Sequence, residues 1–101
     1  VPSTFELAQN IPNPFNPVTN IRVSIVEEAN VTLKVYNLLG EEINTLALNR
    51  SLSKGNHRFI WAGKDDNGNP LPSGVYLYRM EVNSPHGHQL YQSTKKMVLM
   101  K

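Results

Sequence analysis

Short segments in which apolar and polar side chains alternate recur along the chain. The clearest are Asn20–Val26, Val31–Tyr36 and Val75–Val82, each with its apolar residues at every second position. A period of two residues is that of a β-strand with one face buried. No segment keeps a period of 3.6 over three turns, and Thr45 weakens the nearest candidate, Glu41–Leu48. The pattern therefore predicts an all-β chain.

Turn-forming residues separate the alternating segments at intervals of about eight to twelve residues, which is typical of a sandwich or a barrel. The apolar phase changes between Ile43 and Leu46, which predicts a bulge or an edge strand. We expect an immunoglobulin-like antiparallel β-sandwich with seven strands, at Phe5–Gln9, Asn20–Val26, Val31–Tyr36, near Glu42–Leu48, Gly55–Trp61, Val75–Val82 and Leu90–Met100. The proline-rich stretch Ile11–Pro17 is not expected in a central ladder, because proline has no N–H to donate.

Composition narrows the classes of protein without naming one. The 101 residues suit one domain, and the absence of cysteine excludes a disulfide framework and cysteine-based zinc sites. The net charge is only +2, and the basic residues are scattered apart from Lys95, Lys96 and Lys101, so we expect no nucleic acid as a partner. The longest apolar run, Met97–Met100, is too short for a membrane-spanning helix. Val1–Thr4 lacks the features of a signal peptide, and we expect a piece cut from a larger precursor.

Residues capable of catalysis do not form a recognisable set. His86 and His88 fall in a predicted hairpin turn, and no third ligand accompanies them in the sequence. We interpret both as solvated turn residues. No nucleophile is accompanied by an acid or base in a known spacing. We therefore predict no enzyme activity, no cofactor, no metal site and no small-molecule substrate.

The segment Lys64–Asn69 is dense in oxygen-bearing side chains, which calcium prefers as ligands. With Asp65 as its first position, an EF-hand would need glycine at the sixth position and glutamate at the twelfth. Pro70 and Tyr76 stand there instead. This departure favours a loop whose aspartate and asparagine side chains bond their own backbone. Calcium binding stays open as the less favoured alternative.

Aromatic side chains offer a second alternative, a carbohydrate-binding platform. Such a platform needs several aromatic faces exposed on one surface. Alternation instead places Trp61, Tyr76 and Tyr78 on faces assigned to the core, and Tyr91 is the remaining candidate. We expect these residues to pack in the core, and we keep a carbohydrate-binding accessory domain as an alternative.

Four segments resemble, in the expected order, the C-terminal sorting domains of the bacterial type IX secretion system. They are Leu7–Pro17, Val31–Gly40, Leu71–Tyr76 and Thr94–Lys101. The resemblance implies an immunoglobulin-like domain, here residues 1–101, at the C-terminus of a secreted cargo protein. It also implies export through the periplasm and the outer membrane to the cell surface or the medium. The implied partners are the outer-membrane secretion machinery, in some cases a sortase, and the attached N-terminal cargo.

Part of the chain also resembles a related family. Gly63–Gly68 and the Pro72–Tyr76 segment are similar to the immunoglobulin-like domain of flagellar hook-capping proteins. The Pro-Asn-Pro sequence at Pro12–Pro14 and the terminal Lys95–Lys96 block favour the sorting domain. A structural assembly module of the hook-cap type remains the alternative.

The resemblance also singles out site residues. Candidates for recognition by the secretion machinery are Lys95, Lys96, Val98 and Lys101. An equally weighted alternative is that the lysines only solvate the last strand, since lysine is rarely buried without a partner.

Six further residues of these segments are expected to shape the fold: Pro12, Asn13, Pro14, Gly40, Gly74 and Tyr76. The two prolines fix φ and stiffen the start of the sandwich. The two glycines are expected in backbone conformations that other residues avoid. The tyrosine is expected to pack beside Trp61.

Overall fold

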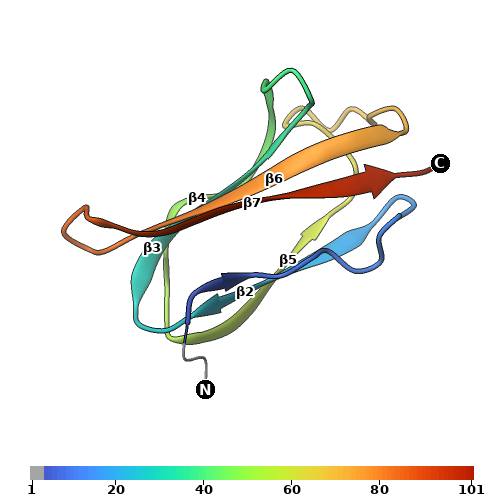
Figure 1. Ribbon diagram of the computed structural model, residues 1–101. Coiled ribbons are helices and arrows are strands. Elements are labelled where there is room, and N and C mark those ends of the chain that lie inside the picture. Colours follow the sequence, from blue (N-terminus) through green and yellow to red (C-terminus); the bar gives the residue numbers. More distant parts are fainter. Residues whose placement is uncertain (1–3) are drawn as a thin grey trace.

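The computed structural model describes residues 4–101, which form two antiparallel sheets packed face to face (Figure 1). One sheet has the strand order β1-β2-β5 and the other the order β4-β3-β6-β7. The seven strands of the described chain are β1 (Glu6–Leu7), β2 (Thr19–Ile25), β3 (Ala29–Tyr36), β4 (Glu42–Leu52), β5 (Gly55–Trp61), β6 (Gly74–Asn83) and β7 (Gln89–Leu99). The predicted seven-stranded immunoglobulin-like sandwich is thereby confirmed. The part of the chain described here has no helix suited to crossing a membrane.

Alternation along the strands builds the core between the two sheets. Every second residue of β2 and β3 is buried, including Ile21, Val23, Leu33 and Val35. Complete burial of such a side chain contributes about 1.5–3 kcal/mol relative to exposure. On β6 the buried face is formed by Tyr76, Tyr78, Met80 and Val82, and β5 adds Phe59 and Trp61. The predicted inward faces of these strands are therefore confirmed.

β4 differs most from the expected strands, because it continues to Leu52 instead of ending near Leu48. The polar residues Asn49–Ser51 have the composition of a turn, yet Arg50 and Ser51 pair with β3. The ladder between β3 and β4 shifts register at three places, which confirms the predicted irregularity. β4 is also an edge strand, so its polar side chains can face solvent while its backbone stays paired.

The first strand is shorter than expected, because its continuous ladder with β2 ends at Leu7, although an isolated bridge still joins Ile11 to Asn20. Ala8 N–H still donates to the carbonyl of Arg22 in β2 (2.9 Å). Seven residues later, Phe15 forms a parallel bridge with Leu99 at the end of β7, in the other sheet. The prolines between these points cannot donate backbone hydrogen bonds, so this stretch forms isolated bridges and no continuous ladder.

Candidate functional site

A segment that follows β1 meets the last residues of β7 in a structure that we call the terminal seam, formed by residues 9–15 and 96–100. Gln9 Nε2 donates to the carbonyl of Lys96 (2.7 Å), and Asn13 Oδ1 accepts the Val98 N–H (3.0 Å). Phe15 N–H donates to the Val98 carbonyl, and its own carbonyl accepts the Met100 N–H (both 2.9 Å). The seam therefore satisfies backbone groups that β7, an edge strand, directs away from β6.

A buried tyrosine fixes the start of the seam. The Tyr78 hydroxyl donates to the Ala8 carbonyl (2.8 Å) and accepts the Asn10 N–H (2.9 Å). Burial raises the pKa of Tyr78 to about 12, because it disfavours the phenolate. Asn10, itself buried, donates from Nδ2 to Thr19 Oγ1 (3.0 Å) and to the Pro12 carbonyl (3.1 Å). A buried polar network with its members paired in this way holds a segment in one conformation.

Aromatic packing supports the seam from inside the sandwich. The Phe15 ring is buried with its centroid 5.7 Å from that of Trp61, and Trp61 lies 5.7 Å from Tyr76 with the rings edge to face. The Tyr76 hydroxyl donates to the Pro72 carbonyl (2.6 Å), and Trp61 Nε1 donates to the carbonyl of Lys64 (2.9 Å). The predicted packing of Tyr76 beside Trp61 is confirmed.

The buried aromatics also bear on the carbohydrate alternative. Trp61, Tyr76 and Tyr78 all lie in the core, as predicted. Tyr91 is half-buried and packs against Phe5, with ring centroids 6.1 Å apart. These four side chains therefore do not form an exposed aromatic platform.

The four candidate recognition residues do not share one face of β7. Lys96 and Val98 point outward, because the alternate residues Met97 and Leu99 are buried. Lys95 lies on the inward-facing side of the strand and is half-buried there. Lys101 is exposed beyond the strand, where its N–H donates to Ser73 Oγ (2.9 Å). Lys96 and Val98 therefore lie on the outer face of β7 within the seam, Lys101 lies just beyond the seam, and Lys95 faces the other way.

The seam includes residues that the sequence did not single out. Asn13 was expected to shape the fold, but nothing in the sequence showed that it contacts Val98, 85 residues away. Gln9, Ile11 and Met100 carried no signal of their own. The only hint was that both partner segments belong to the four that resemble sorting domains.

The turn between β3 and β4 bears out the prediction for Gly40. This glycine has φ = +85°, in the left-handed region that glycine enters without steric cost. Its N–H donates to the Asn37 carbonyl (3.0 Å), and Asn37 Oδ1 accepts the N–H groups of Leu39 (2.9 Å) and Glu41 (3.0 Å). Gly74, with φ = +159°, lies at the margin of the extended region, so its backbone departs less from what other residues adopt.

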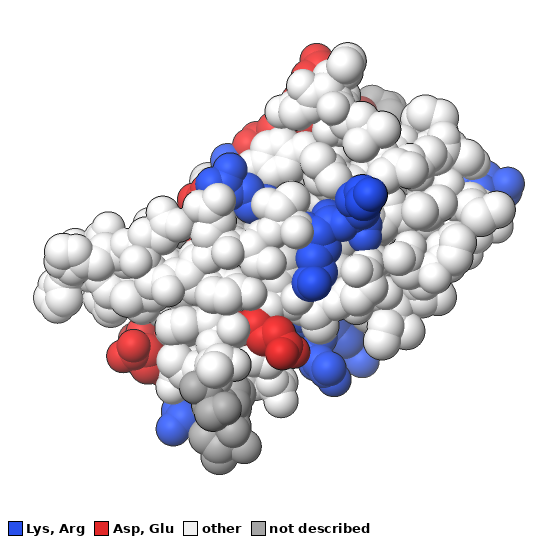
Figure 2. Space-filling view, viewed as in Figure 1, with Lys and Arg blue, Asp and Glu red and all other residues white. Residues whose placement is uncertain are grey.

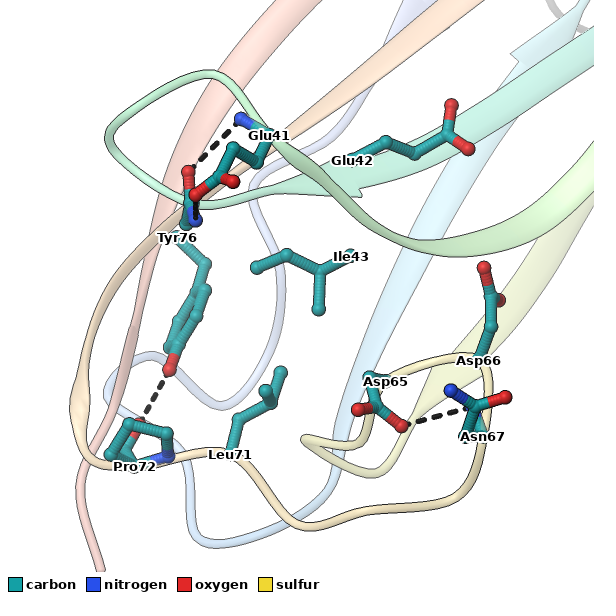
Figure 3. Close-up of a pocket in the computed structure, with 10 residues that line it drawn as sticks. Glu41, Glu42, Ile43, Asp65, Asp66, Asn67, Leu71, Pro72 and Tyr76 are labelled. Carbon is teal, nitrogen blue, oxygen red and sulfur yellow. Dashed lines mark hydrogen bonds between the residues drawn. The ribbon is translucent and has the colours of Figure 1, made fainter.

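A hollow of about 530 Å³ lies between this turn and the loop that follows β5 (Figure 3). Ile43, Leu71 and Tyr76 give it an apolar lining, and carboxylates including those of Asp65 and Asp66 surround it. These carboxylates already have partners in the protein: Asp66 Oδ1, for example, accepts the N–H of Thr45 (3.0 Å). The hollow is therefore a gap between two loops, and its polar side chains form hydrogen bonds within the protein.

The loop at Lys64–Asn69 has the internal hydrogen bonds that were expected. Asp65 Oδ1 accepts the backbone N–H groups of Asn67 and Asn69, both at 2.9 Å. Hydrogen bonding from Asn69, chiefly from its backbone N–H, lowers the pKa of Asp65. Among residues 4–101, no three His, Cys, Asp or Glu side chains are grouped so that they could hold a metal ion.

The distribution of charge can be followed on one face of the molecule (Figure 2). On the face drawn in Figure 2, lysine and arginine side chains occur in separate clusters, with acidic groups and wide uncharged areas between them. Proteins that bind nucleic acid instead gather basic residues on one face or stripe. The face drawn lacks that arrangement.

The fold defines an immunoglobulin-like β-sandwich domain, and a comparison of sequences identifies its family. The family model described as the FlgD Ig-like domain matches residues 16–86, so the chain belongs to this family. No curated protein matches the sequence.

Among solved structures, similar folds occur in two bacterial systems. Dimeric latent PorU from Porphyromonas gingivalis is 26% identical with a TM-score of 0.77, over 99% of this chain and 10% of PorU. FlgD from P. aeruginosa is 21% identical with a TM-score of 0.65, over 88% of this chain and 71% of FlgD. PorZ of P. gingivalis, described as an essential surface component of the type IX secretion system, is 16% identical with a TM-score of 0.53, over 92% of this chain and 11% of PorZ.

These likenesses confirm the resemblance seen in the sequence, both to type IX secretion proteins and to hook-capping proteins. The chain spans only about a tenth of PorU.

Proposed function

We propose that this chain is a non-catalytic C-terminal sorting domain that directs an attached cargo protein across the outer membrane through the type IX secretion system. The observation that carries the proposal is the extent of the likeness to PorU, which covers 99% of the chain. The FlgD Ig-like family match, by contrast, spans residues 16–86 and includes neither side of the terminal seam. The structural likeness to PorU extends over both sides of the seam and has a higher TM-score than the likeness to FlgD from P. aeruginosa (0.77 compared with 0.65).

The arrangement of the chain ends is compatible with recognition at the seam. In Figure 1 the C-terminus lies at the far end of β7, whereas the first strand begins on the lower side of the molecule. In this proposal, a cargo joined upstream of β1 is attached away from the end of β7. Lys96 and Lys101 are exposed there and can take part in charge-guided association.

An export assay tests the proposal. The domain is fused to the C-terminus of a periplasmic fluorescent reporter that carries a signal peptide, in a host with an active type IX system and in the same host lacking its translocon. We expect reporter on the cell surface or in the medium of the first host only. Reporter that stays in the periplasm of both hosts, with the domain folded, would overturn the proposal.

Two variants locate the signal within the domain. Removal of Lys96–Lys101 should abolish export, and the double substitution Lys96→Ser/Lys101→Ser should reduce it while leaving the fold intact, because both side chains are exposed. Undiminished export of both variants would show that the C-terminal end is not what the machinery reads.

The family match supports one alternative, a structural assembly module of the hook-cap type. That function requires the parent protein to self-associate through a defined interface. Light scattering distinguishes the two proposals: a parent that forms a defined oligomer, together with a domain that fails to export a reporter, would favour assembly.

A further inference from the structure

Two arginines stand directly opposite each other on the outer face of the three-stranded sheet. Arg22 of β2 is the ladder partner of Arg58 of β5, and we call these two residues the arginine pair. Both side chains are exposed, on the face opposite to the core residues Val23 and Phe59. Like charges directly opposite each other in a sheet are destabilising. The arrangement is therefore unfavourable unless an anion lies between the two guanidinium groups.

The backbone pattern brings the two arginine side chains close together. The Arg22 carbonyl accepts the Ala8 N–H (2.9 Å), on the side of β2 that faces away from β5. In an antiparallel ladder the N–H and C=O groups of one residue point to the same side, so Arg22 and Arg58 form a pair without hydrogen bonds between them. The Cα atoms of such a pair are about 4.5 Å apart, closer than those of a hydrogen-bonded pair. The two positive charges therefore start from neighbouring points.

No acidic side chain neutralises the arginine pair within residues 4–101. The ion pairs in this part of the chain are Lys34–Glu42 and Arg79–Glu81, and both belong to the other sheet. Glu6 of β1 shares the outer face, but it lies in the next row of the sheet and forms no ion pair with either arginine. The compensating anion therefore has to come from outside the described chain.

A hollow of about 200 Å³ adjoins the arginine pair, and Ile11 and Asn20 are also among its lining residues. Ile11 is bridged to Asn20, and Asn20 is the ladder partner of Ile60. These three side chains therefore form the next row on the same face of the sheet. Ile11 is 69% exposed and Ile60 is 60% exposed. Two exposed isoleucines thus lie in the row beside the two cations.

We propose that the arginine pair binds the phosphate group of an anionic lipid headgroup, and that Ile11 and Ile60 contact the apolar part of the same lipid layer. The planar fork of a guanidinium group binds two oxygens at once, so one arginine already satisfies a carboxylate, whereas a phosphate offers oxygens to both arginines. The isoleucines favour a lipid over a free phosphate, because binding at a membrane surface combines apolar burial with attraction to anionic lipids. This inference does not depend on the sorting function.

Sedimentation of the 101-residue chain with vesicles tests the lipid site. The vesicles contain phosphatidylcholine alone or phosphatidylcholine mixed with phosphatidylglycerol. We expect binding to the mixed vesicles only, and we expect Arg22→Gln/Arg58→Gln to weaken it by about tenfold. The control Lys54→Gln/Lys64→Gln removes the same charge from two other exposed positions and should change binding little. An equal loss in both double variants, or equal binding to both kinds of vesicle, would overturn the site.

Inorganic phosphate separates the anion site from the lipid. A ligand that binds only the folded state raises Tm, so phosphate should raise the Tm of the wild type above its value in chloride of the same ionic strength. The rise should be absent from Arg22→Gln/Arg58→Gln. A rise in Tm without binding to anionic vesicles would assign the pair to a soluble phosphoester and overturn the lipid. An equal rise in the wild type and the arginine variant would overturn the arginine pair as the site.

The isoleucines have a test of their own. Ile11→Ser/Ile60→Ser should keep the phosphate-dependent rise in Tm but bind the mixed vesicles several-fold more weakly, because only the apolar contact is lost. Leu48→Ser is the matched control, since Leu48 is 68% exposed on β4 in the other sheet, and it should bind as the wild type does. Unchanged binding of the isoleucine variant would overturn the contact of Ile11 and Ile60 with the lipid layer.

Discussion

The terminal seam and the loop at Lys64–Asn69 use the same kind of hydrogen bond over very different distances along the chain. In the loop, Asp65 Oδ1 accepts N–H groups two and four residues ahead. In the seam, Asn13 Oδ1 accepts an N–H 85 residues ahead. The loop can form as soon as its own residues turn, whereas the seam depends on both sheets. Damage to the seam should therefore lower the stability of the whole domain, and damage to the loop should remain local.

The largest effect is expected from Phe15→Ala, which removes a buried ring that packs on Trp61 beneath the seam. We expect a loss of about 3–5 kcal/mol in the free energy of unfolding, the usual cost of truncating a buried phenylalanine. Denaturant unfolding measures it, with the exposed Leu39→Ala as a control that should change little. If Phe15→Ala lowers the free energy of unfolding no more than Leu39→Ala does, the Phe15 ring does not stabilise the core beneath the seam.

Tyr78→Phe tests the polar anchor of the seam without changing its packing. The substitution leaves the Asn10 N–H without its hydroxyl acceptor and the Ala8 carbonyl without its donor, at a cost of about 1–3 kcal/mol. Tyr36→Phe, on the outer side of β3, is the matched control and should be nearly neutral. If both variants unfold at the same denaturant concentration, the hydroxyl does not hold the seam.

Alkaline pH probes the same anchor in the unmodified protein. The pKa of Tyr78 is about 12 in the folded protein, compared with an ordinary value of 10.0. A folded-state pKa above the unfolded value means that stability is complete below pH 10 and is lost as the pH rises towards 12. Tm measured over this range should fall more steeply for the wild type than for Tyr78→Phe. Parallel curves would assign the alkaline loss to other groups.

The smallest effect is expected in the loop and only in acid. Hydrogen bonds from Asn69 lower the pKa of Asp65 below its ordinary value of 3.8. A lowered pKa contributes stability that is present above the ordinary value and is lost as the pH falls through the folded pKa. Asp65→Asn should remove this acid dependence, which thermal unfolding at pH values below about 4 can detect. An unchanged acid profile would mean that the carboxylate charge does not support the loop.

The sequence predicted those parts of the fold that depend on nearby residues. Gly55–Trp61 has the bounds of β5 because alternation is clear there and turn residues stand at both ends. The hydrogen bonds within the Asp65 loop were also predictable from nearby residues, because donor and acceptor lie within four residues of each other. β4 was underestimated because Asn49–Ser51 has the composition of a turn, and only the partner strand β3 keeps it extended.

The seam could not be predicted in the same way. No local pattern indicates that Asn13 will meet Val98, or that Tyr78 will bond the backbone at Ala8 and Asn10. The resemblance to sorting domains singled out both chain ends but did not indicate that they touch. The placement of Lys95 and Lys96 on opposite faces of β7 was predictable, because these residues alternate with the apolar residues Met97 and Leu99.

The most direct test of a folded recognition surface is to export one reporter with two different C-terminal fusions. One carries the whole domain, and the other carries only the last strand and the residues after it, Gln89–Lys101. We predict that the whole domain directs the reporter to the cell surface or the medium, and that the isolated strand leaves it in the periplasm. Export of the reporter by the isolated strand, at the level of the whole domain, would contradict recognition of the folded domain.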